Sequence, residues 1–159
     1  MRLGAESETT FFALMNAFER QVRAAVYASF RDRSAAPSVA ELSDALSASR
    51  EEVSSALHNL AGEHCIVLVP GTESIWMAHP FSGIETDFAV TIGDRQWFAN
   101  CVWDGLSILA LLGEGSLDTH SPATGESMRF QVSEGVVHGS GIVHFLVPAR
   151  HFWDDIGYT

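Results

Sequence analysis

Two helix-start signals lie close together in the first third of the chain and limit what that part can fold into. Ser38-x-x-Glu41 and Ser49-x-x-Glu52 are capping boxes, in which the serine hydroxyl accepts an amide N–H and the glutamate carboxylate reaches back to the serine amide. Each box predicts a short helix that begins at or just after its serine, over about residues 38–47 and 50–62.

The flanking segments extend this helical unit on both sides. Apolar residues recur at steps of three and four from Thr9 to about Phe30, which predicts one long amphipathic helix. After the helices come an apolar strand at 65–69, a Pro-Gly turn and a second strand at 74–78. Helices followed by a hairpin are typical of a winged helix, so we expect a winged-helix-like subdomain over residues 1–80.

The second half of the chain has the pattern of an antiparallel sheet with short helices. It predicts a hairpin of strands 88–92 and 95–99, a helix at 103–112, strands at 115–120, 127–132 and 142–147, and a last amphipathic turn at 151–156. We therefore expect an α+β protein whose second subdomain, residues 81–159, is a mainly antiparallel β-sheet with short helices.

Charge narrows the classes of partner. The 159 residues contain no lysine, and 9 arginines face 20 acidic residues, for a formal net charge of −11. Such a surface repels phosphates, and the second capped helix opens with Arg50-Glu51-Glu52, which is a poor reader of DNA. Nucleic acid is thus an unexpected partner, and we expect the helical unit to be a scaffold or dimer element, which leaves a homodimer open.

No feature of the sequence indicates export or a membrane. The start of the chain is polar and acidic, unlike a signal peptide, and the longest apolar run, 106–112, is too short to span a bilayer. Cys65 and Cys101 are far apart in sequence, so we expect reduced thiols and a cytoplasmic protein.

The richest chemistry lies around Cys101. If a helix begins there, Cys101 and Asp104 lie on one face of its first turn, and the helix N-terminus favours a thiolate. A soft sulfur ligand would then stand beside a carboxyl group able to carry a proton. A small core cysteine and a carboxylate that only stabilises the helix start are the plainer alternative.

The motif and its surroundings resemble the organomercurial lyase (alkylmercury lyase) family. That family has a Cys and an Asp spaced like Cys101 and Asp104, and the resemblance extends through Ala110-Leu-Leu-Gly113, Thr119-His-Ser-Pro-Ala-Thr-Gly125 and Ile142-Val-His-Phe-Leu-Val-Pro148. It covers the chain from about residue 10 onward.

The resemblance implies protonolysis of a carbon–mercury bond without an organic cofactor. Cys101 would bind an organomercurial or another thiophilic metal, Asp104 would carry the proton to the departing carbon, and Hg(II) would stay on sulfur until small thiols removed it. Trp97, Phe98 and Trp103, with Phe152 and Trp153, would make a dry pocket for an apolar group, although a core role is the plainer reading of most of them.

The sequence departs from the family pattern at two cysteines. The family's second catalytic Cys is expected at or just after Thr159, and no Cys follows Cys101 in these 159 residues. Ser121 stands where the family's Thr-Gly motif has a Cys, and we expect Cys65 to be a core residue. With one site thiol, binding of mercury is expected more than fast lysis, and whether the protein is an enzyme stays open.

Other functions remain as alternatives. One is a non-catalytic binding module of the same fold for a thiophilic metal or a small apolar ligand, and another is a transcriptional regulator that uses the winged-helix part. A zinc site could be assembled only in three dimensions, for example from His120, His138 and His144.

Overall fold

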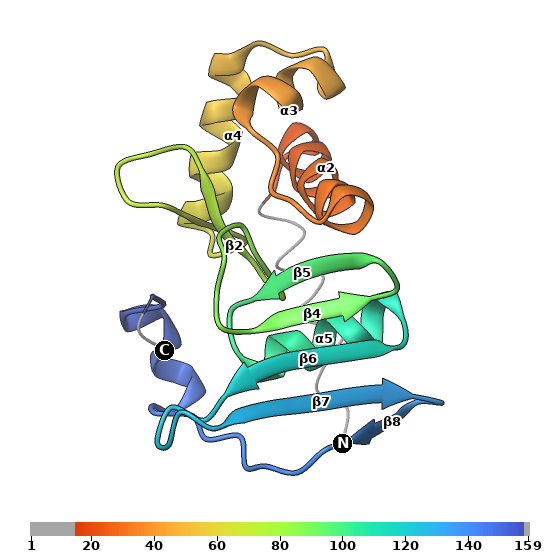
Figure 1. Cartoon of the computed structure of the whole chain (residues 1–159). Coiled ribbons are helices and arrows are strands. Elements are labelled where there is room, and N and C mark those ends of the chain that lie inside the picture. The colour runs from red at the N-terminus through yellow and green to blue at the C-terminus, as the bar shows by residue number, and fades with distance from the viewer. Residues whose placement is uncertain (1–14, 158–159) are drawn as a thin grey trace, which may run out of the picture.

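The computed structural model describes residues 15–157, which form a helical layer above one curved sheet (Figure 1). The helices are α2 (Ala17–Arg33), α3 (Val39–Leu46) and α4 (Arg50–Gly62). Both predicted capping boxes are present, with Ser38 and Ser49 as the N-cap residues of α3 and α4. The two short helices predicted from them are therefore confirmed.

The long helix predicted from Thr9 to about Phe30 is confirmed from Ala17 onward, but Met15 and Asn16 lie outside it. Asn16 is the N-cap of α2, because its side chain accepts the Glu19 N–H and the Glu19 carboxylate accepts the Asn16 N–H. This third capping box begins the helix at Ala17 and leaves Met15 outside it, although Met15 is buried. Residues 9–14 of the predicted helix lie outside the described residues.

Within residues 15–157, eight antiparallel strands make one sheet. They are β1 (Val67–Leu68), β2 (Ile75–Ala78), β3 (Phe81–Ser82), β4 (Ala89–Ile92), β5 (Arg95–Ala99), β6 (Gly115–His120), β7 (Ser127–Ser133) and β8 (Val136–His138), in the order β1-β2-β3-β5-β4-β6-β7-β8. The predicted hairpin of β4 and β5 is confirmed, with Val90 opposite Trp97. The short strand β3 was not predicted.

Of the predicted strands, one is not formed and another is shorter than expected. Residues 142–147 form no strand, because β7 already pairs with β8 and the segment finds no partner among the described strands. Ile142 is 94% exposed there, so the alternation of apolar residues was misleading. The strand expected at 65–69 is reduced to Val67–Leu68 by an irregularity in its pairing with β2. The expected final turn is a 3-10 helix, η1 (Ala149–Asp154).

The helices and the sheet share one core. The Trp97 indole N–H on β5 donates to the Phe30 carbonyl of α2 at 2.6 Å, and the rings of Phe30 and Phe81 stack at 5.1 Å. The boundary proposed at residue 80 falls between β2 and β3, which pair with each other, so the two proposed subdomains continue into one sheet. No helix within residues 15–157 is long and apolar enough to cross a membrane.

Helix α5 (Val102–Leu112) packs against β4, β5 and β6 and begins where β5 ends (Figure 1). Ile108 and Leu109 are buried between the helix and the sheet. Gly105 faces Leu117 of β6 so closely that a Cβ there would stand 2.7 Å from a Leu117 methyl carbon. The first turn of α5 is thereby held at the edge of the core, next to the loop between β2 and β3.

Candidate functional site

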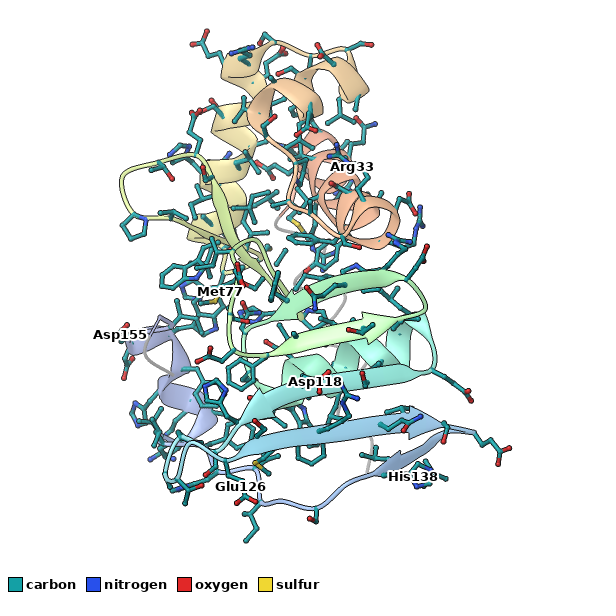
Figure 2. The ribbon with its side chains drawn as sticks, viewed as in Figure 1. Arg33, Met77, Asp118, Glu126, His138 and Asp155 are labelled. Atoms are coloured by element: carbon teal, nitrogen blue, oxygen red, sulfur yellow. The ribbon has the colours of Figure 1, made fainter. Side chains whose placement is uncertain are left out.

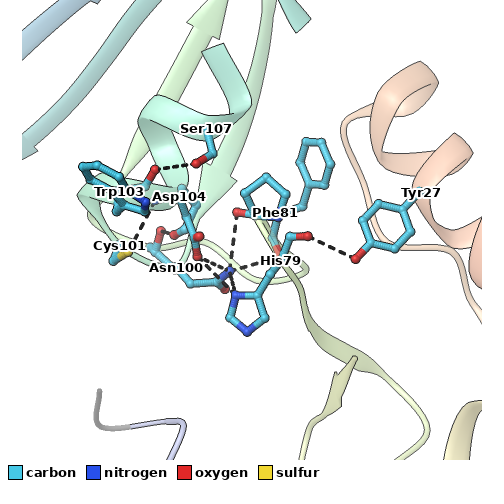
Figure 3. A network of polar contacts seen from close by, with 11 residues as sticks. Tyr27, His79, Phe81, Asn100, Cys101, Trp103, Asp104 and Ser107 are labelled. Atoms are coloured by element: carbon cyan, nitrogen blue, oxygen red, sulfur yellow. Dashed lines mark hydrogen bonds and ion pairs between the residues drawn. The ribbon is translucent and has the colours of Figure 1, made fainter. Parts of the chain in front are cut away.

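The thiol of Cys101 caps helix α5. Cys101 has extended backbone angles, and its Sγ accepts the Asp104 amide N–H at 3.4 Å (Figure 3). A cysteine is an unusual cap, since Ser, Thr, Asp and Asn are the common ones. The prediction that a helix begins at Cys101 is confirmed, and the thiol and Asp104 share its first turn.

The amide groups of this helix start favour a thiolate as expected, but burial of the thiol outweighs them. Burial raises the pKa of the Cys101 thiol above its ordinary value, and the Asp104 carboxylate adds to the rise. The amide N–H groups of Asp104 and Trp103 lower the pKa but do not outweigh the loss of solvation. In the free protein at neutral pH, the Cys101 sulfur therefore carries its proton.

The Asp104 carboxylate lies in a small polar network behind the thiol (Figure 3). Its Oδ2 accepts the Asn100 side-chain N–H at 2.9 Å and lies 3.3 Å from His79 Nδ1. The Asp104 side chain is 17% exposed, whereas the His79 side chain is 38% exposed. The carboxyl group is thus mostly shielded, and the imidazole beside it is the more accessible of the two groups.

Asn100, which directly follows β5, also contacts the segment between β2 and β3 and the first residue of β3. Its Nδ2 also lies 3.3 Å from the Phe81 carbonyl oxygen and 3.4 Å from the Pro80 carbonyl oxygen. Its Oδ1 is buried without a hydrogen-bond partner among the described residues. The Pro80 and Phe81 carbonyl oxygens lie on the Nδ2 side of the amide and therefore fix its orientation. The Asn100 Nδ2 group is thereby directed at Asp104 as a donor.

Sequence reasoning missed both His79 and Asn100. They contact Asp104 from sequence separations of 25 and 4 residues, and neither belongs to a spacing that indicates a site. The only available signal was that Asn100 directly precedes Cys101. The contact with His79 depends on β3, which brings the end of β2 beside the start of α5.

The aromatic residues expected to form a pocket are dispersed. Trp97 is buried in the core under α2, Phe98 is half-buried on the opposite face of β5, and Trp103 is 59% exposed beside Cys101. Phe152 packs against Phe145. Trp153 instead stacks on His64 at 4.0 Å and meets the His79 ring edge-on at 6.3 Å. Thr159 lies outside the described residues.

The other candidate ligands do not gather around Cys101. Cys65 is buried, with its Sγ 3.9 Å from the Met15 sulfur, and both cysteines are free. No group of three or more His, Cys, Asp or Glu side chains within residues 15–157 could hold a metal ion, so the zinc cluster is not formed there. His138, for example, lies on the outermost strand β8 (Figure 2).

Hollows in the surface lie elsewhere. One is lined by residues of α2 and α4, and another lies between α3 and the segment that leads into β2. Neither contains Cys101, Asp104 or His79. The site at the start of α5 is therefore a shallow surface position in this structure, with the thiol half-buried.

Comparison with known proteins identifies a family and a similar fold. The family model of alkylmercury lyase, MerB, matches residues 81–159. A solved structure, the crystal structure of the mercury-bound form of MerB2, matches with a TM-score of 0.65 and 23% identity over 82% of this chain and 63% of that chain. This chain therefore spans less than two thirds of that structure, and at this identity the likeness shows the fold, which confirms the α+β expectation. No curated protein matches the chain.

Proposed function

Because residues 81–159 belong to the alkylmercury lyase family, we propose that the chain binds an organomercurial at Cys101 and cleaves its carbon–mercury bond by protonolysis. The observation that carries the proposal is the shared first turn of α5, where the Cys101 sulfur accepts the Asp104 N–H and the Asp104 carboxyl group lies in its own hydrogen-bond network. A soft sulfur and a proton carrier are the two groups that this reaction needs.

The first step is exchange at mercury. Thiolate sulfur is the preferred partner of a soft metal, so the Cys101 sulfur displaces the ligand X from an R–Hg–X substrate. The S–Hg bond forms as the Hg–X bond breaks. Since the Cys101 pKa is raised, the sulfur loses its proton during this step, and X departs with a proton when X is itself a thiolate.

The second step is cleavage. Asp104, in its protonated form, donates its proton to the carbon, and the electron pair of the C–Hg bond becomes the new C–H bond. The hydrocarbon R–H leaves, and Hg(II) stays on the Cys101 sulfur. Mercury is Hg(II) before and after the step, so the reaction needs no redox partner or organic cofactor. Small thiols then remove the Hg(II).

A second candidate is retention of mercury without fast turnover. Among the described residues, the other thiol is that of Cys65, which is buried against Met15 and whose pKa is raised by burial. A mercury ion held by Cys101 would then have one sulfur ligand from this part of the chain. This arrangement favours binding over rapid release, and it is the same site put to a non-catalytic use.

One experiment separates these functions. The protein is incubated with phenylmercury and an excess of a small thiol, and released benzene and protein-bound mercury are both measured. Lysis predicts benzene that is abolished in Cys101→Ser and kept in Cys65→Ser. Retention alone predicts bound mercury without benzene, again lost only in Cys101→Ser. If neither benzene nor bound mercury is found, the proposed function is wrong.

A further inference from the structure

The proton that Asp104 donates has to be replaced, and the structure offers one side chain for this. His79 Nδ1 lies 3.3 Å from the Asp104 carboxylate, and the ring's other nitrogen points away from the network (Figure 3). Resting on the proposed function, we infer that His79 is the positioning residue of Asp104 and passes it a proton from solvent. The acting pair is thus Asp104 at the substrate and His79 behind it.

The geometry determines which ring nitrogen carries the proton. His79 Nδ1 lies 3.3 Å from both the Asp104 carboxylate oxygen and Asn100 Nδ2. The two hydrogens of Asn100 Nδ2 have oxygen acceptors in Asp104 and Phe81, whereas an ionised carboxylate and an unprotonated Nδ1 would set two lone pairs against each other, so Nδ1 bears the hydrogen when Asp104 is ionised. Asn100 Nδ2 satisfies the same carboxylate oxygen at 2.9 Å. Together the two donors hold the carboxylate in one orientation on the first turn of α5.

His79 is held through both its backbone and its ring. The Tyr27 hydroxyl donates to the His79 backbone carbonyl at 3.0 Å, and Trp153 of η1 meets the ring edge-on. The Trp153 indole is in turn stacked on His64 at 4.0 Å, with only 6° between the planes. A ring constrained in this way is preorganised for one partner, which is what a relay to Asp104 requires.

The exposure of the two side chains indicates which of them receives a proton from solvent. The His79 side chain is 38% exposed and the Asp104 side chain is 17% exposed, so the imidazole is the more accessible of the two groups. A proton from solvent binds at Nε2 and the Nδ1 proton passes to Asp104 Oδ2. One proton enters and one is delivered, so the ring ends neutral and the carboxyl group is again an acid.

A separate source is needed because the Cys101 proton is used elsewhere. When the substrate arrives as a thiol adduct, the departing thiolate takes up the proton that Cys101 loses. The carbon must then receive a proton of other origin. Asp104 can donate only once without help, and His79 is the titratable side chain in contact with its carboxylate among the described residues.

The test compares two His–Asp pairs in each of which a ring nitrogen lies 3.3 Å from a carboxylate oxygen. His79→Gln should slow single-turnover benzene release from bound phenylmercury by about 10- to 100-fold and leave mercury binding at Cys101 unchanged. The control is His120→Gln, because His120 Nε2 also lies 3.3 Å from a carboxylate, but from that of Asp87 and not from that of Asp104. Release at the control rate in His79→Gln would overturn the inference.

Chemical rescue separates a relay from a merely structural role. Added imidazole should restore release in His79→Ala and have no effect on the wild type, since a free imidazole can occupy the vacated place and carry the proton. Failure of imidazole to restore any activity in a folded His79→Ala variant would contradict the proton-passing role.

A spectroscopic readout keeps the inference testable if the wild type releases no benzene, an outcome that would reject lysis. The nitrogen NMR signals of His79 should show the hydrogen on Nδ1 in the wild type and lose that preference in Asp104→Ala, while His120 stays unchanged. The same tautomer in both proteins would show that Asp104 does not hold the ring, and the inference would fail independently of the proposed function.

Discussion

The Cys101 sulfur accepts the amide N–H of Asp104 at 3.4 Å, and the two side chains occupy the first turn of one helix. The thiol is thereby placed next to a carboxylate and beside a buried face of α5. Two effects on the thiol oppose each other here, because the amide donors stabilise the thiolate whereas burial and the Asp104 charge destabilise it. Burial is the largest of them.

This balance predicts the reactivity of Cys101 toward an alkylating reagent such as iodoacetamide. Because the pKa of the thiol is raised, alkylation of Cys101 at neutral pH should be slower than that of an unhindered exposed thiol and should accelerate as the pH rises through alkaline values. In Asp104→Asn, the backbone N–H remains and the negative charge is lost. The pH profile should therefore shift to lower pH.

Mass spectrometry of the peptide that carries Cys101 gives the rate at each pH, with Cys65→Ser as the background so that only one thiol reacts. An unchanged profile in Asp104→Asn would mean that the carboxylate does not act on the thiol.

Because β6 lies close to β4 at Gly115, replacing this glycine should destabilise the protein. In Gly115→Ala, the new Cβ would overlap the Thr91 carbonyl oxygen of the neighbouring strand and stand 2.9 Å from an Ile92 side-chain carbon. We expect a loss of about 1–3 kcal/mol in the free energy of unfolding, measured by urea titration.

Gly62→Ala is the matched control, because a Cβ at Gly62 meets nothing within 4 Å at the end of α4. This substitution should leave stability unchanged or raise it by about 0.4–1 kcal/mol. Equal effects of the two substitutions would contradict the close approach of β4 and β6.

The capping box of α3 predicts a pH-dependent contribution to stability. The Arg33 guanidinium, with the Ser38 amide and hydroxyl, lowers the pKa of Glu41 from 4.5 to about 2. A carboxylate with a lowered pKa in the folded state stabilises it fully above its unfolded pKa, and this stabilisation is lost as pH falls through the folded pKa.

The wild type should therefore unfold at a higher temperature than Glu41→Gln at pH 7, and the difference should vanish as the pH falls from about 5 to about 2. Because the pair is exposed, added salt should reduce the difference at pH 7. A difference in melting temperature that is constant with pH would show that the glutamine variant differs for a reason other than charge.

The local features of the fold could be predicted from the sequence because short-range signals determine them. The Ser38 and Ser49 capping boxes mark the starts of α3 and α4, and a Gly93-Asp94 turn marks the β4–β5 hairpin. The strand predicted at 142–147 failed because apolar alternation alone does not supply a partner strand. Similarly, the apolar steps of three and four concealed the Asn16 cap, at which α2 begins.

The candidate site could be predicted only in part, for a comparable reason. Cys101 and Asp104 are three residues apart, so a helix start is enough to bring them together. His79 reaches Asp104 only because β3 joins β2 to β5, and β3 is two residues long. The raised Cys101 pKa likewise depends on burial, which no local spacing encodes.

The most direct test of lysis at Cys101 is a single turnover with one equivalent of phenylmercury, followed by mass spectrometry that locates mercury on the protein. Benzene should appear in the same amount as Hg(II) bound to the peptide that contains Cys101, and both should be lost in Cys101→Ser. Benzene and bound mercury that persist in Cys101→Ser, or mercury found on Cys65 instead, would contradict it.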